Sequence, residues 1–145
     1  MSKLFRTTLW ILSGVGLIAF LVQTLSTFLI SPLMGLLSLL IAAVLVALVI
    51  YLLQRSPMWA RPARLWALLA FLWGGGVAVA LALISSGPVM QLAIGTGWVD
   101  AMMSWSGAYP EEISKATGVI FVLMSFRQLN RPWHGWIVGA VVGLG

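Results

Sequence analysis

The chain is organised as long apolar runs separated by short polar links. Four runs approach the roughly 20 residues that a membrane-crossing helix needs, and they lie at 8–30, 33–53, 65–85 and 110–127. A fifth run, 133–145, is shorter. Ser31-Pro32 makes a tight break between the first two runs. The pattern predicts an all-α, polytopic helical membrane protein with about four full transmembrane helices and a truncated fifth, in a single membrane domain over 1–145.

The stretch 89–108 departs from this pattern. It carries Gly95, Gly97, Asp100 and Gly107 among its apolar residues. Glycines weaken a helix interior, and a charged side chain is costly within a bilayer. We expect a short interfacial or re-entrant element here rather than a full span.

The composition indicates that the protein is integral to a membrane. Hydrophobic residues make up 61% of the chain and charged residues 8%, whereas soluble domains are about 45–50% apolar and about 25% charged. The net charge of +5 comes from basic residues scattered beside apolar runs. This is typical of topology signals at a lipid bilayer, so we expect no nucleic-acid partner. The lack of cysteine excludes a thiol nucleophile, and a single histidine excludes an HExxH zinc motif.

The basic residues fall in links that share one side of the membrane. They precede the first run, separate the second from the third, and separate the fourth from the fifth: Lys3, Arg6, Arg55, Arg61, Arg64, Arg127 and Arg131. The positive-inside tendency then predicts a cytoplasmic N-terminus, with Asp100 and the start of the fourth helix outside. The first run exceeds the 7–15 residues of a signal-peptide core, so we expect it to be a retained helix.

Two further patterns indicate membrane packing. Tryptophans near the ends of predicted spans are typical of an interfacial aromatic belt; they are Trp10, Trp59, Trp66, Trp133 and Trp136. Small residues recur every four positions on the third and fifth helices, which favours close helix contacts; they are Gly74, Ala78 and Ala82, and Gly135, Gly139 and Gly143.

The candidate chemistry lies at the start of the fourth run, in Pro110-Glu111-Glu112-Ile113-Ser114-Lys115. The chain has only three acidic residues, and two of them are adjacent here. Proline suits a first helical turn, so we expect the helix to begin at Pro110 and Lys115 to reach either glutamate.

Two interpretations of this cluster compete. The acids could simply complement the positive end of the helix dipole, with Lys115 neutralising one carboxylate, for about 0.3–1 kcal/mol. Alternatively, one glutamate is a general base that polarises a water, and Lys115 orients the other. The first interpretation accounts poorly for two acids and a lysine in a chain with so few charges.

These residues also resemble a known family. The run that begins at Pro110-Glu111-Glu112 resembles the EExxK signature of the PrsW intramembrane proteases, distant relatives of the type II CAAX prenyl proteases. Phe71-Leu72-Trp73-Gly74 resembles the family's "FLWG" helix, and the segment from Arg131 to Gly145 resembles the glycine-spaced helix that follows the signature. The resemblance runs from about Leu65 to the end of the chain.

The resemblance implies a peptidase of the bacterial cytoplasmic membrane that cleaves membrane proteins such as anti-sigma factors. It maps Glu111 and Glu112 onto the catalytic glutamates and Lys115 onto the motif's lysine. The family's later FxxxE and HxxxD motifs are absent from residues 1–145: no acidic residue follows Glu112, and Val138 stands four residues after His134. We therefore expect a fragment of a longer domain, inactive alone. Two carboxylates and a downstream histidine could ligate zinc or act without it, and the sequence leaves the cofactor open.

Three other functions compete with a PrsW-like protease. A rhomboid-type serine protease would pair Ser106 with His134, which the expected topology places a membrane apart. A small transporter or channel subunit would use the two glutamates for protons or cations. A non-catalytic assembly protein would use the glycine stripes to bind a partner helix, and the missing later motifs favour it.

Overall fold

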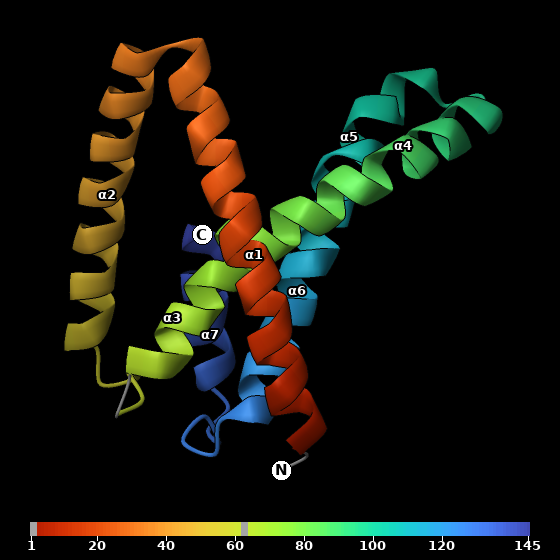
Figure 1. Cartoon of the computed structure of the whole chain (residues 1–145). Helices are drawn as coiled ribbons and strands as arrows, with labels where there is room; N and C mark the ends of the chain where they lie inside the picture. The colour runs from red at the N-terminus through yellow and green to blue at the C-terminus, as the bar shows by residue number, and fades with distance from the viewer. Residues whose placement is uncertain (1–2, 62–63) are drawn as a thin grey trace.

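The first two helices form a long antiparallel hairpin. The computed structural model describes residues 3–61 and 64–145, and α1 (Lys3–Ile30) and α2 (Pro32–Arg55) are its longest single α-helices (Figure 1). Ser31 has an extended backbone, and Pro32 occupies the first position of α2, where its missing N–H leaves no bond unmade. The break predicted at Ser31-Pro32 is therefore a two-helix turn.

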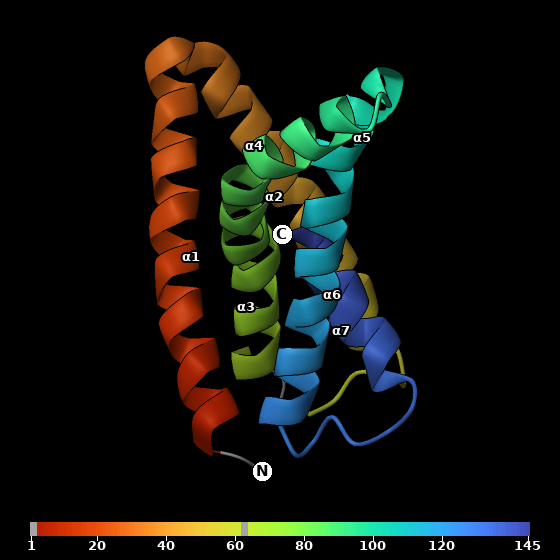
Figure 2. The same ribbon diagram turned by 90° about the vertical axis from the view of Figure 1, so that its right-hand side faces the viewer.

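The third run forms a helix longer than expected, Leu65–Gly95. It consists of α3 (Arg64–Leu72), a π-helical segment η1 (Trp73–Ala78) and α4 (Val79–Gly95). The apolar run predicts a helix over 65–85, whereas the observed helix continues through Pro88, which lies inside α4. A proline removes one backbone donor and bends a helix rather than always ending it, and α4 turns away from the axis of α3 in Figure 2.

Glycine ends this helix ten residues later than predicted. Gly97 has a left-handed φ of 78°, and two N–H groups close the end: Gly97 N–H donates to Ile94 O and Trp98 N–H to Ala93 O, both at 3.0 Å. This arrangement is a Schellman motif. The stretch 89–108 is therefore the end of α4, a turn, η2 (Val99–Ala101) and α5 (Met102–Ser106). It forms no full span of its own, but its first residues belong to the long helix Leu65–Gly95 rather than to a short interfacial or re-entrant element.

The fourth and fifth runs form α6 (Ala108–Ser125) and α7 (His134–Leu144). The start of α6 lies two residues before Pro110, because α5 leads almost directly into it and Gly107 N–H bonds Met103 O at 3.0 Å. Within the described part of the chain, three helices are long and apolar enough to cross a membrane: α1, α2 and Leu65–Gly95. The shorter α6 carries three charges, and α7 has 11 residues. The chain is thus a polytopic helical membrane protein.

The π-helical segment η1 is where helices cross. A Cβ on Gly74 would collide with Val142 O of α7, and one on Gly76 would collide with Gly16 O of α1. A Cβ on Gly118 of α6 would collide with the Trp73 ring. Because glycine lacks that carbon, α1, α6 and α7 all approach η1 closely.

The core around this crossing is built from aromatic and branched side chains. The largest fully buried ones are Trp66, Trp73, Leu9, Leu69, Val122, Val138, Val141 and Val142. Trp66 and Trp59 pack together with ring centroids 4.8 Å apart. Both had been expected in an interfacial belt, and both are core residues instead, whereas Trp10 and Trp136 are exposed.

The basic links and the acidic residues lie at opposite ends of the helix bundle. In Figure 1 the N-terminus, the α2–α3 link and the α6–α7 link lie at one end of the bundle, and the α1–α2 and α4–α5 turns lie at the other. The basic residues expected on one membrane side belong to the first end. Asp100 and the start of α6 belong to the second.

Candidate active site

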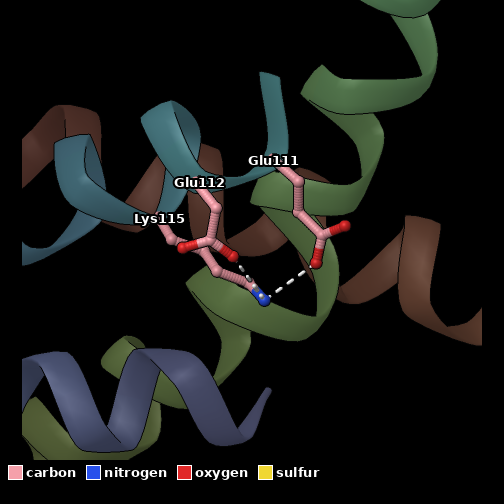
Figure 3. A network of polar contacts seen from close by, with 3 residues as sticks. All are labelled: Glu111, Glu112 and Lys115. Carbon is pink, nitrogen blue, oxygen red and sulfur yellow. Dashed lines mark ion pairs between the residues drawn. The ribbon is translucent and has the colours of Figure 1, made fainter. Parts of the chain in front are cut away.

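The two glutamates and Lys115 converge on one flank of α6. Lys115 Nζ lies 2.8 Å from Glu111 Oε1 and 3.9 Å from Glu112 Oε1 (Figure 3). These are contacts across four and three residues of one helix, as the spacing predicted. The lysine therefore bridges both carboxylates, with Glu111 as its closer partner.

The three side chains differ in exposure. Those of Lys115, Glu111 and Glu112 are 20%, 40% and 72% exposed. An exposed ion pair stabilises a protein by only about 0–1 kcal/mol, so the cluster contributes little to the fold. Its effect is to order Glu111 against the lysine while the oxygens of Glu112 stay accessible.

A buried tryptophan holds α6 beside this cluster. The indole N–H of Trp73 donates to Ser114 O at 2.9 Å, and Ser114 directly precedes Lys115. The Trp73 ring also stacks on Phe121, with centroids 5.3 Å apart. The sequence pattern gives Trp73 no role of its own, although the residue lies in the FLWG stretch. Its partner is 41 residues away, so no local pattern could have identified it.

An apolar groove of about 360 Å³ lies on another flank of α6. It is lined by Val89, Trp105, Tyr109, Pro110 and Ile113. Ile113 and Lys115 are two residues apart, and residues with this separation do not share a helix face. The groove therefore does not contain the charged cluster.

Comparison with known proteins identifies the family. The family model described as PrsW family intramembrane metalloprotease matches residues 62–145, more than half of the chain. The chain belongs to the PrsW family. No curated protein and no solved structure matches it. The PrsW match covers η1 and α6, and so includes Trp73, Glu111, Glu112 and Lys115.

The family description implies a metal, so the donors present in this PrsW chain can be tested for a site. Catalytic zinc usually takes three protein ligands. Within residues 3–61 and 64–145, no three His, Cys, Asp or Glu side chains come together. Glu111 and Glu112 offer carboxylate oxygens, but they are only two of the three ligands needed, and the ammonium of Lys115 lies 2.8 Å from Glu111 Oε1. The described residues do not form a metal site, and the groups available for proton transfer are the carboxylates and the lysine.

The rhomboid-type alternative has no support in this geometry. Ser106 Oγ donates to Met102 O at 2.7 Å, and His134 Nδ1 accepts the N–H of Arg131 at 3.0 Å. α5 lies at the end of the bundle opposite to the start of α7 (Figure 1). The two side chains do not form a dyad.

Of the two small-residue stripes, only the one on the third helix lies at a crossing. Gly74 faces Val142 O of α7. A Cβ on Gly135 or Gly143 would meet nothing within 4 Å, and one on Gly139 would reach only Val119, at 4.0 Å. The PrsW chain therefore brings α7 to η1 through its valine face and Gly145, not through its glycine stripe.

Proposed function

We propose that this chain supplies the water-activating groups of an intramembrane peptidase, with Glu112 as the general base. The observation that carries the proposal is the unequal sharing of Lys115, at 2.8 Å from Glu111 and 3.9 Å from Glu112. A general base needs an accessible oxygen within hydrogen-bond reach of the water. Glu112 is the more exposed and the less tightly paired of the two carboxylates.

The proposed reaction is hydrolysis of one peptide bond. Glu112 removes a proton from a water, whose oxygen then bonds to the scissile carbonyl carbon. The carbon–nitrogen bond breaks as the protonated Glu112 returns its proton to the leaving nitrogen. Glu111 and Lys115 hold each other, which keeps the lysine from pairing closely with Glu112.

The proposed substrate is a single-pass membrane protein such as an anti-sigma factor, in the bacterial cytoplasmic membrane. Family membership supports a membrane-embedded substrate, and the long apolar helices support residence in the bilayer. We place the N-terminus in the cytoplasm, because the basic links gather at its end of the bundle.

Reconstitution tests the proposed activity directly. The protein, extended by any coding sequence that continues in frame beyond codon 145, is placed in proteoliposomes with a single-pass anti-sigma-factor reporter that carries a fluorophore and a quencher on either side of its membrane helix. We expect cleavage by the wild type, loss of cleavage by the E111Q/E112Q double variant, and wild-type cleavage by D100N. Asp100 is the matched control because it is the one other acidic residue. Equal cleavage by all three proteins would refute the assignment.

The proposed orientation can be measured by single-cysteine labelling, since the chain has no cysteine of its own. Asn130 in the α6–α7 link and Thr96 at the end of α4 are both exposed. In intact cells a membrane-impermeant maleimide should label Thr96→Cys, and should label Asn130→Cys only after the membrane is opened. The reverse pattern would show that the N-terminus is outside.

A further inference from the structure

Trp73 connects the crossing point of the helices to the charged cluster. It is the first residue of η1 and is 1% exposed. Its indole N–H bonds Ser114 O at 2.9 Å, and its ring stacks on Phe121 at an interplanar angle of 26°. Both partners belong to α6, which carries the charges.

The fit between the indole and α6 leaves little freedom. Gly118 lies against the Trp73 ring, where a Cβ would overlap the indole. The hydrogen bond fixes the height of α6 along η1, because the indole has a single donor and that donor meets one carbonyl. The stacked Phe121 and the glycine fix the rotation of α6 about its own axis.

We propose that Trp73 is a positioning residue for the reaction, acting through Ser114 on Lys115 and Glu112. This inference rests on the proposed peptidase function. Ser114 O belongs to the same turn as Glu112 and Lys115, so a shift or rotation of α6 at this carbonyl moves both groups relative to η1. Misplacement of a catalytic group by 1 Å can cost about 100-fold in rate. The wide turn of a π-helix is frequent at functional sites, and here it begins at the positioning residue.

The chain contains a matched control for this hydrogen bond. Trp66 is also fully buried and also donates its indole N–H to a backbone carbonyl, Ala60 O at 3.2 Å. This bond joins α3 to the link before it and involves no residue of α6. W73F and W66F therefore each remove one indole hydrogen bond from the same core. Only the bond lost in W73F is made to α6.

The experiment measures kcat and KM for the single-pass reporter in proteoliposomes that hold the full-length protein. We expect W73F to lower kcat by roughly 10- to 100-fold with KM nearly unchanged, and W66F to leave both near wild type. Equal kcat for W73F and W66F would overturn the positioning role. This failure differs from failure of the proposed function, in which the E111Q/E112Q variant would cleave as well as the wild type.

A second substitution keeps the test decisive if W73F folds poorly. Replacing Trp73 alone by 3-benzothienylalanine keeps the ring shape and puts sulfur where the N–H was. Replacement by 5-fluorotryptophan keeps the N–H. We expect a reduced kcat with the first analogue and a restored kcat with the second, a contrast that a purely structural role would not produce. Equal kcat values for the two analogues would overturn the proposal.

Discussion

Replacing Glu112 by glutamine is expected to lower kcat for reporter cleavage by roughly 100- to 10,000-fold, the usual range for loss of a general base. The amide keeps the size of the side chain but cannot accept a proton from water. KM should change little, because Glu112 is proposed to act on the water and not on the substrate. Reporter cleavage in proteoliposomes, with kcat and KM fitted separately, measures the effect.

Glu111 should respond differently, because it is the closer partner of Lys115. In E111Q the lysine loses its partner at 2.8 Å and is free to pair with Glu112, which lies 3.9 Å away. Pairing with the lysine would occupy the Glu112 carboxylate, so Glu112 would accept a proton from water less readily and kcat would fall. Adding K115M should then release Glu112, so the E111Q/K115M double variant should cleave faster than E111Q alone. Cleavage by the double variant that is slower than or equal to that by E111Q would contradict these roles. If kcat fell less in E112Q than in E111Q, Glu111 would be the general base and Glu112 would not.

The second large effect is expected on stability, from Gly76→Ala. The new methyl group would collide with the backbone of α1 at Gly16 O, and neither backbone can move without disturbing the helix crossing. We expect the free energy of unfolding to fall by about 1–3 kcal/mol or more. Denaturant titration in mixed detergent micelles, followed by helix content, measures the loss.

Gly87→Ala is the matched control on the same long helix. A Cβ there meets nothing within 4 Å, so alanine should stabilise the helix by up to about 1 kcal/mol through its better propensity. Gly16→Ala and Gly14→Ala form a second such pair on α1, since a Cβ on Gly16 would meet Val77 and one on Gly14 would meet nothing. Similar unfolding free energies within each pair would contradict the assigned crossing.

The local features of the candidate site were predictable. The contact of Lys115 with both glutamates follows from spacings of four and three residues on a helix, and the structure confirms it. The family resemblance is confirmed by the match over 62–145. The catalytic roles of Glu111, Glu112 and Lys115 stay predictions until the variants above are measured.

Two sequence predictions were wrong because each relied on a local signal that the surrounding structure outweighed. The glycines and Asp100 of 89–108 favoured an end at about Ser85, but the helix passes through Pro88 and continues to the Schellman motif at Gly97. Trp59 and Trp66 were expected at the membrane interface on account of their positions near span ends. They are buried instead because the two rings pack against each other and the Trp66 indole finds a carbonyl partner at Ala60.

The sequence by itself determined the class of protein, the first two helices and the pairing of charges within α6. Each of these follows from hydropathy or from spacings within one helix. Only the tertiary structure decided which glycines lie at helix crossings and which tryptophans are buried, and it alone joined Trp73 to Ser114. These contacts link residues tens of positions apart, and their partners are chosen by how whole helix surfaces pack rather than by any local pattern.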